Sequence, residues 1–522
     1  MRKLFNTLKG DYLQRSRSYA FLITIAIAVY VAHAFVPPPE ANYSTLNLSG
    51  YKGVYNSAWA GHISALMATL LLSLCGFYLV NGAIKKDIDT EVGLIIAATP
   101  ITNFGYLFVK FLGNIMILFT ISCITLLVGI IMFFIQNSGY PFQIGHFLSP
   151  YLFMVVPAVI LVSGLAIAAE VFLSQRTILQ NVIYFFMFTF MITGMMRKAN
   201  SLGAYAGDTL GLGIITNSIK DQVNKQFNED ITEVSVGYIM QQDKNFKTFE
   251  WNGPSWNINY VAGRLVWIGL ICLLVYISSF FFHRFDFKQT VKLSLLLKTP
   301  EEKTASIPYS SFQRSALPEI IPAYGIIPFI KIELLLMIRK DAKWLWIINI
   351  VLWIATLFSP LLVAYSFLLP ALFFLQVNRI SDLATKEVTN RLHYFTFASY
   401  QPLRRLLSAQ ILAGFTLLTI LALPVIIRLL LNFNNFLLIL QALNGIVFIV
   451  ALSVCLGLLS GGKKLFEILF FLLTYIAFQM PDAHYLGKIS NFSYPFLTTF
   501  LVINIILLIV IFLIRKHQIR TL

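Results

Sequence analysis

Long runs of apolar residues alternate with short polar segments along almost the whole chain. A helix of about 20 apolar residues spans the hydrocarbon core of a bilayer, and most runs approach or exceed that length. We therefore predict an all-α polytopic membrane protein with about twelve transmembrane helices. Residues 344–377 contain two apolar runs separated by Ser359-Pro360. They are compatible with one bent helix or with two short spans joined by a tight turn. The predicted spans lie near Tyr19–Phe35, Ala58–Ile84, Tyr106–Ile135, Phe147–Leu173, Thr177–Met196, Tyr260–Phe282, Trp344–Phe358, Leu361–Val377, Leu403–Leu429, Phe436–Leu459, Leu465–Met480 and Tyr494–Ile514.

Two long polar segments interrupt this pattern and separate two sets of six runs. The first, Arg197–Asn257, is predicted to be an outer loop that forms a small ordered cap, with a helix around Ile219–Ile239. The second, residues 284–328, contains five prolines and is typical of a linker. We therefore expect a first unit at 1–283, this cytoplasmic linker, and a second unit at 329–522.

Composition and charge agree with placement in a membrane. The chain is 58% hydrophobic and 12% charged, whereas soluble proteins carry about 25% charged residues. A soluble enzyme, a disordered chain and a nucleic-acid-binding domain are therefore excluded. The net charge of +16 fits the positive-inside rule, since 29 of the 39 cations fall in segments predicted to be cytoplasmic. We expect a multi-pass protein of the plasma (inner) membrane with both termini in the cytoplasm.

Few residues within the predicted spans offer chemistry. The four cysteines are scattered through apolar stretches, which favours buried apolar side chains over disulfides or metal ligands. Glu170, Glu467, Arg264 and Arg428 lie near span ends, where snorkelling or pairing with a nearby charge satisfies them. Intramembrane acids are what a proton- or sodium-coupled carrier uses, and none lies at the middle of a predicted span.

Both halves begin with a short amphipathic stretch next to cations. We predict that each stretch is a helix lying in the membrane interface on the cytoplasmic side. The alternative is that each is the extended start of the following span. The apolar positions are Leu4, Leu8 and Tyr12 in the first half, and Ile332, Leu335 and Leu336 in the second.

A charged segment between two spans also occurs in both halves. An offset of 300 residues aligns Ala98-Thr99 with Ala398-Ser399. We predict a charged cytoplasmic helix followed by a turn with a small hydroxyl residue in each copy, and the N-terminal acids of the first copy suit the helix dipole. The alternative is a solvated loop. The candidate site residues are Asp87, Asp89, Thr90, Glu91, Gly93, Thr99 and Pro100 in the first copy, and Asp382, Lys386, Glu387, Arg391 and Ser399 in the second.

The run Glu91-x-Gly93, Ala98-Thr99-Pro100 and Lys110 resembles the cytoplasmic loop between spans two and three of type-2 exporter permeases. These are the membrane subunits of ATP-binding-cassette (ABC) transporters. The resemblance covers nearly the whole chain as two fused units, each with an elbow helix, six spans and a coupling helix. It implies a permease without catalytic residues, cofactor or metal of its own. ATP and Mg²⁺ would belong to a separate cytoplasmic ABC ATPase in two copies.

The second copy departs from the family pattern. In the second copy, Arg391 stands at the position of Glu91, and His393 at that of Gly93. Tyr400 stands at the position of Pro100, and Gln410 at that of Lys110. We therefore expect an asymmetric pair of units. The resemblance further implies export of an amphipathic or hydrophobic substrate such as a lipid, peptide or drug.

One segment imitates a nucleotide-binding loop. Gly457–Lys464 matches GxxxxGK but ends in lysine, so the hydroxyl that binds Mg²⁺ is missing. It follows an apolar run and lacks the strand that precedes such loops, so we interpret it as a glycine-rich cytoplasmic turn with positive-inside lysines.

Two other functions remain open from the sequence. One is a twelve-span secondary transporter with an internal repeat. The other is the membrane anchor of an ABC-type complex that drives an extracytoplasmic partner, for which residues 197–257 would be the docking loop. Membrane lipid is an expected partner in every case, and nucleic acid is not.

Overall fold

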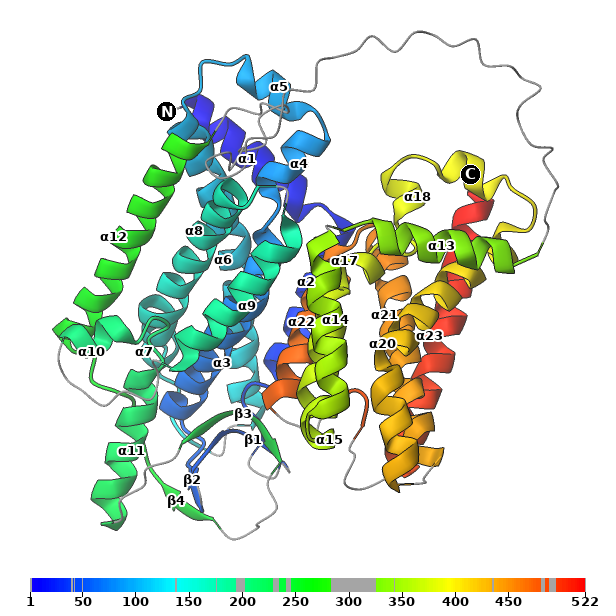
Figure 1. The fold of residues 1–522 in the computed structure, drawn as a ribbon. Helices are drawn as coiled ribbons and strands as arrows, with labels where there is room; N and C mark the ends of the chain where they lie inside the picture. Colours follow the sequence, from blue (N-terminus) through cyan, green and yellow to red (C-terminus); the bar gives the residue numbers. More distant parts are fainter. Residues whose placement is uncertain are drawn as a thin grey trace, which may run out of the picture.

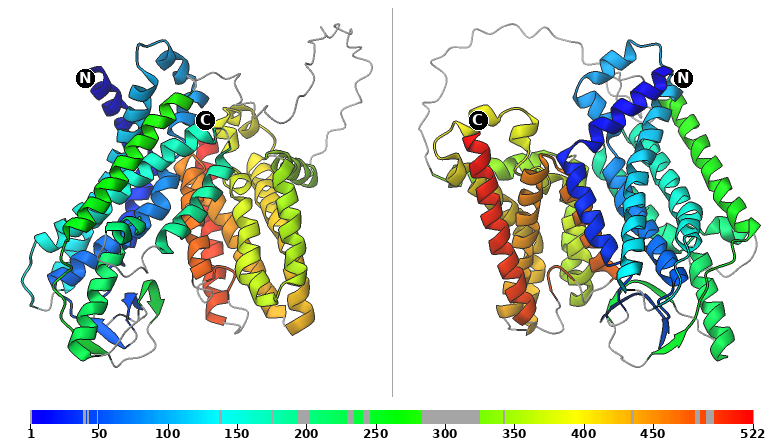
Figure 2. Two further views of the ribbon diagram at one scale, coloured as in Figure 1. Left: turned by 60° about the vertical axis from the view of Figure 1, so that its left-hand side comes forward. Right: turned by 180° about the vertical axis from the view of Figure 1, so that it is seen from behind.

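The computed structural model describes residues 2–38, 41, 43–48, 50–136, 139–174, 176–193, 202–228, 234–240, 246–282, 325–341, 343–433, 436–479, 484–487 and 494–521. Most of the predicted linker at 284–328 lies outside these residues. The molecule is mostly helical, and the helices of the two halves stand side by side (Figures 1 and 2). Both chain termini lie at one end of the bundle, which we call the terminal end, and the strands lie at the other (Figure 1).

The first half consists of long helices joined by short ones at both ends of the bundle. Its helices are α1 (Arg2–Ser16), α2 (Tyr19–His33), α3 (Ser57–Val80), α4 (Ala83–Asp89), α5 (Val92–Ala97), α6 (Asn103–Gln136), α7 (Gly145–Pro150), the π-helical segment η1 (Tyr151–Val155), α8 (Val156–Phe172), α9 (Thr177–Thr193), α10 (Leu202–Gly207), α11 (Gly213–Phe227) and α12 (Ile258–Phe281).

The second half repeats this plan with shorter connections. Its helices are α13 (Ile327–Arg339), α14 (Lys343–Phe358), α15 (Leu361–Val363), η4 (Ala364–Leu368), α16 (Leu369–Leu375), α17 (Val377–Ile380), α18 (Lys386–Thr389), α19 (His393–Phe397), η5 (Leu403–Leu407), α20 (Ser408–Phe433), α21 (Phe436–Ser460), α22 (Lys464–Gln479) and α23 (Tyr494–Arg520). The chain breaks at Ser359-Pro360 and folds back, because α14 packs against both η4 and α16. Residues 344–377 therefore form two helices and not one bent helix.

Several helices have the length and composition of membrane spans. Among the described residues, seven are long and apolar enough to cross a bilayer, or up to nine if each of two bent pairs is one span. Side chains of α12 and α23 leave wide apolar surfaces exposed, as at Leu265 and Ile506. These features indicate a membrane-embedded helical protein. Each of the twelve predicted runs coincides with helical structure, but twelve spans stay a prediction.

The amphipathic stretches at the start of each half are separate helices that lie at an angle to the next one. The bend is 70° between α1 and α2, and 99° between α13 and α14. Ser18 lies at the first bend and is the N-cap of α2, since its hydroxyl accepts a hydrogen bond from the Phe21 N–H at 3.2 Å. Each stretch is therefore a helix bent away from the one that follows, and we call α1 and α13 the elbow helices. Their position in the membrane interface stays a prediction.

The end opposite the termini carries a small cap with strands. β1 (Tyr43–Asn47) pairs antiparallel with β3 (Ser235–Met240), and β2 (Tyr51–Gly53) pairs parallel with β4 (Lys247–Phe249). The loop after α2 thus joins the predicted outer loop, parts of which lie outside the described residues. These short strands are a small addition to a mostly helical chain, which is consistent with the predicted all-α class. The helix expected at Ile219–Ile239 is corrected to α11 followed by β3.

The two halves meet along α2, α3, α21 and α22. Helix α22 packs on α3, and α2 packs on α21. The ring of Phe471 lies 4.0 Å from that of Tyr78 between centroids, and Phe188 contacts Tyr475 at 5.5 Å. Aromatic pairs of this kind add about 0.5–1.5 kcal/mol to the burial of their area. The interface is therefore apolar over most of its length, and its polar residues gather at the terminal end.

Candidate functional site

The two charged segments that repeat in the sequence are two loops at the terminal end of the bundle, α4–α5 and α18–α19 (Figure 1). Both loops break between their helices at a residue in the left-handed region, Glu91 with φ 59° and Arg391 with φ 56°. Left-handed backbone is uncommon for residues with a Cβ. Its occurrence at positions 300 apart shows that the repeat extends to the backbone.

The residues after these breaks repeat the same hydrogen bonds. The Thr99 hydroxyl donates to the Ile96 carbonyl at 2.6 Å, and the Ser399 hydroxyl donates to the Thr396 carbonyl at 2.6 Å. Before the breaks, Thr90 and Asn390 bond the carbonyls four residues earlier through their side chains. The register of the repeat is therefore 300 residues throughout the loop, without a shift.

A buried ionic network holds the first loop against its elbow helix. Lys110 Nζ lies 2.8 Å from a carboxylate oxygen of Asp87 on α4, and 2.7 Å from one of Asp11 on α1. Tyr106 donates to Asp87 at 2.8 Å. Arg15 pairs with Asp11 at 2.8 Å. Since Lys110 and both acids are less than a tenth exposed, the network ties α1, α4 and α6 into one unit.

Close packing of the first elbow helix on α6 makes this network possible. A Cβ at Gly113 would lie 2.6 Å from the Asp11 carboxylate, which is closer than real side chains approach. Glycine at 113 therefore gives Asp11 its access to Lys110. The sequence pattern included Lys110, but it gave no sign that Asp11 would be its partner.

The second loop is held by a different set of polar residues. Gln410 lies at the position of Lys110 and donates to Glu387, the counterpart of Asp87. The cation comes from α23, where Arg515 lies 3.7 Å from a Glu387 oxygen. Lys386 pairs with Glu333 of the elbow helix α13. Burial raises the pKa of Glu387 above its ordinary value, because these partners offset only part of the desolvation.

A second cluster fixes the bend between α13 and α14. Arg379 Nε lies 2.9 Å from an Asp341 oxygen, and Lys340 Nζ lies 2.6 Å from an Asp382 oxygen. Asn378 also donates to Asp341 at 2.8 Å. Burial lowers the pKa of Lys340. The predicted site residue Asp382 thus helps to hold the second elbow helix.

The outward face of both loops is apolar. Three apolar side chains of α5 are 42–69% exposed, and the three apolar side chains at the matching positions of the second loop are 52–79% exposed. The two matched sets are Val92, Leu94 and Ile95, and Leu392, Tyr394 and Phe395. We call these six residues the loop faces. Exposed apolar clusters of this kind mark surfaces that contact a protein or a membrane.

The predicted site residues therefore fall into two groups. Asp87, Gly93 and Glu387 are buried, while Asp382 and Lys386 are half-buried in ion pairs. The exposed or half-exposed group next to the loop faces contains Asp89, Thr90, Glu91, Thr99, Pro100, Arg391 and Ser399. Only this second group is placed to touch a partner. Sequence reasoning missed Asp11, Glu333 and Arg515, whose positions on other helices give no local signal.

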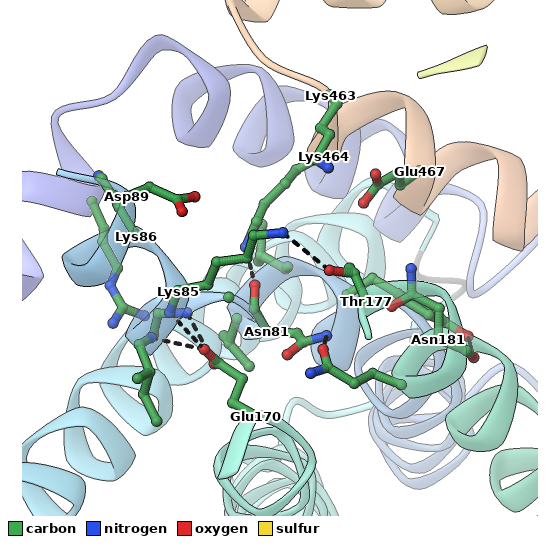
Figure 3. Close-up of a pocket in the computed structure, with 18 of the residues that line it drawn as sticks. Asn81, Lys85, Lys86, Asp89, Glu170, Thr177, Asn181, Lys463, Lys464 and Glu467 are labelled. Carbon is green, nitrogen blue, oxygen red and sulfur yellow. Dashed lines mark hydrogen bonds between the residues drawn. The ribbon is translucent and has the colours of Figure 1, made fainter. Parts of the chain in front are cut away.

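A cavity of about 750 Å³ lies between the halves beside the first loop (Figure 3). Lys464 of α22 reaches across it and donates to the Asn81 carbonyl. The Glu170 carboxylate accepts backbone N–H groups of Ala83, Ile84 and Lys85 at 2.8–3.1 Å and so caps α4.

The charges near span ends have partners that the sequence did not indicate. The expected pairing of Glu170 and Glu467 with neighbouring cations is replaced by this cap and by a bond from Ser381 to Glu467 at 3.3 Å. Arg264 donates to the Thr209 carbonyl at 2.7 Å, and Arg428 donates to the Thr356 carbonyl at 2.5 Å. Backbone groups therefore satisfy Glu170, Arg264 and Arg428, and the Ser381 hydroxyl satisfies Glu467, where snorkelling or pairing with a nearby charge was expected.

Comparison of the chain with protein-family models, with curated proteins and with solved structures finds no match.

Proposed function

We propose that the chain is the permease of an ATP-driven exporter of the type-2 ABC class, whose α4–α5 and α18–α19 loops dock two copies of a cytoplasmic ATPase. The observation that carries this proposal is the pair of loop faces. They repeat at 300 residues, lie at the same end of the bundle and share one backbone geometry. A symmetric pair of ATPases offers two equivalent grooves, and a short helix with apolar anchors fits such a groove.

The polar networks give these loops a route for transmitting motion. Lys110 connects the first loop to the elbow helix α1 and to α6, so a push on α5 moves three helices together. Separating such buried charges costs about 3–5 kcal/mol, which favours displacement of the unit as a rigid body. In this proposal ATP and Mg²⁺ stay on the ATPase, the termini are cytoplasmic, and closure of the two ATPases tilts the attached spans.

The experiment is co-purification of ATPase activity with the tagged chain from its native membrane in mild detergent. Replacing Leu94 and Ile95 by alanine in one variant, and Tyr394 and Phe395 in another, removes the anchors of one loop at a time. Each truncated anchor at a protein interface costs about 1–2 kcal/mol. We expect each variant to lose about tenfold or more of the bound ATPase activity.

A matched control replaces exposed apolar residues of the elbow helices, Phe5 and Ile332, by alanine. Both side chains are more than half exposed and lie outside the loop faces. This variant should retain its ATPase. Retention by the loop variants as well, or transport by the chain alone in proteoliposomes without ATP, would overturn the proposal.

A further inference from the structure

The cavity between the halves has a strongly basic wall. Five of its lining side chains are cations and three are carboxylates. Four of the cations are lysines from two distant segments, Lys85 and Lys86 on α4 and Lys463 and Lys464 at the start of α22 (Figure 3). Among the described residues, the structure records no carboxylate within 4 Å of any of the four.

The lysines are held in place by neutral groups. Lys85 donates to the Thr177 hydroxyl at 3.2 Å, Lys463 donates to the Asn378 amide oxygen at 3.2 Å, and Lys464 donates to the Asn81 carbonyl. The nearby Glu170 carboxylate accepts three backbone N–H groups. Lys463 repels Lys85 and Lys464, while Glu170 and Glu467 attract them. Because five cations face three carboxylates in the lining, an anion placed among the lysines improves the balance of charge.

A small apolar groove lies next to the basic cavity, between α2, α3 and α22. Its lining includes Ala28 and Val31 of α2, Leu72 of α3, and Leu472 of α22. This space is small, about 50 Å³, and shares the lining residues Thr24, Leu79 and Ile468 with the basic cavity, so the two spaces are adjacent. The charged cavity lies at the terminal end, and the apolar groove lies next to it between α2, α3 and α22. This arrangement matches the two parts of an amphiphile, a charged headgroup and an apolar chain.

We propose that this cavity and groove bind an anionic amphiphile, a lipid with a phosphate or similar acidic headgroup, at the interface of the two halves. The headgroup lies among Lys85, Lys86 and Lys463, and the first part of one acyl chain lies against the apolar residues between α2, α3 and α22. The cavity volume is within the range of about 300–1,000 Å³ typical of ligand sites. As the substrate site of the exporter it rests on the proposed function, whereas binding itself does not.

Binding is measured on the purified, delipidated full-length chain by native mass spectrometry. Phosphatidylglycerol and phosphatidylcholine with identical acyl chains serve as the anionic and zwitterionic probes. We expect the chain to bind the anionic lipid about tenfold or more tightly, from roughly 1 kcal/mol per nearby lysine. Equal affinity for the two lipids would overturn the proposal.

The site is located with a triple variant, Lys85→Gln, Lys86→Gln and Lys463→Gln, which leaves the buried contact of Lys464 intact. Its matched control is Lys9→Gln, Lys331→Gln and Lys516→Gln, three exposed lysines on α1, α13 and α23 outside the cavity. The cavity variant should lose the preference for phosphatidylglycerol, and the control should keep it. Equal losses in both variants contradict a specific site.

Two further arms separate the lipid from a free anion and place its chain. Inorganic phosphate at the same concentration should not displace phosphatidylglycerol, and complete displacement would identify a free-anion site instead. A phosphatidylglycerol with a photoreactive acyl chain should label peptides of α2, α3 and α22. Labelling confined to the outer faces of α12 and α23 would contradict the groove. These readouts need no ATPase, so their failure is distinct from failure of the permease proposal.

Discussion

The α4–α5 and α18–α19 loops have the same backbone but different supports. In the first, Lys110 lies between two carboxylates at 2.7 and 2.8 Å. In the second, glutamine occupies that position, and the cation is Arg515 of the last helix, 3.7 Å from Glu387. The difference shows that loop geometry depends on a buried carboxylate being compensated, while the helix that supplies the compensation can change.

The helix that supplies the cation decides what moves with each loop. Lys110 links the first loop to its neighbour α6 and, through Asp11, to the elbow helix. Arg515 links the second loop to α23, and Lys386 separately links it to the second elbow helix. Two equal pushes on the loops would therefore displace different sets of helices. The two halves are therefore alike in the left-handed break of their loops and unequal in their connections.

The largest expected effect follows from removing the shared cation of the first loop. Lys110→Met leaves Asp87 buried without a cation and leaves Asp11 with Arg15 as its cation. The free energy of unfolding in mild detergent should therefore fall by about 3–5 kcal/mol. Gln410→Met at the matching position should cost only about 1 kcal/mol, because Arg515 remains. Thermal unfolding followed by tryptophan fluorescence checks both. Equal losses would mean that the supports do not differ in this way.

The next effect concerns the cation of the second loop. Arg515→Met should destabilise the protein by about 3 kcal/mol near neutral pH, since Glu387 is left buried as a carboxylate. A raised pKa means that the folded state binds the proton more readily than the unfolded state. Protonation of Glu387 therefore favours the folded state. This contribution to stability is present in full below the ordinary pKa of 4.5 and is lost as pH rises through the pKa of the folded state.

Stability of Arg515→Met should therefore recover as the pH falls from 7.5 toward 5, by more than in the unmodified protein. Adding Glu387→Gln should restore most of the stability at pH 7.5 and remove the extra pH dependence of Arg515→Met, because position 387 then carries no carboxylate. Unfolding measured across this pH range in the three proteins decides the matter. A pH-independent loss in Arg515→Met would show that Glu387 does not need this partner.

The sequence contained enough information for the helices and for the existence of the two loops. Apolar runs located the helices because burial in lipid or protein demands continuous apolar sequence. The 300-residue offset that aligns Ala98-Thr99 with Ala398-Ser399 also relates Glu91 to Arg391, the two residues with left-handed backbone. Local patterns of charge and small residues therefore predicted where each loop lies and how the copies align.

The supports of the loops could not be predicted in the same way. Arg515 and Glu387 form a pair although they are far apart in sequence. Lys463 and Lys464 belong to a glycine-rich turn in the sequence, and only the fold brings them to the same cavity as α4. The strands of the cap were not predicted for a related reason, since β1 and β3 are short and are separated by nearly two hundred residues in the sequence. Tertiary proximity of this kind leaves no periodic trace in a single sequence.

Exposed charge next to the loop faces gives a smaller effect. Glu91→Arg gives the first loop the charge of the second, and Arg391→Glu does the reverse. In the proposed complex, a rim charge changes binding of the ATPase by about 1 kcal/mol or less, about twofold to fivefold, without changing stability. Bound ATPase activity and its coupling to transport should fall in Glu91→Arg. Unchanged coupling in both variants would count against contact at these residues.

The smallest effect tests the shared backbone itself. Glycine adopts the left-handed region without the steric cost that a Cβ imposes, but it also increases the freedom of the unfolded chain. Glu91→Gly and Arg391→Gly should therefore each stabilise the protein slightly, by about 0.5–1 kcal/mol, and by similar amounts because φ is 59° and 56° at the two positions. Glycine at Thr90 and at Asn390, which end the preceding helices without positive φ, is the control and should destabilise instead. Stabilisation at 91 with destabilisation at 391 would mean that the two loops differ in backbone as well as in support, because a common left-handed residue must respond to glycine in the same direction in both.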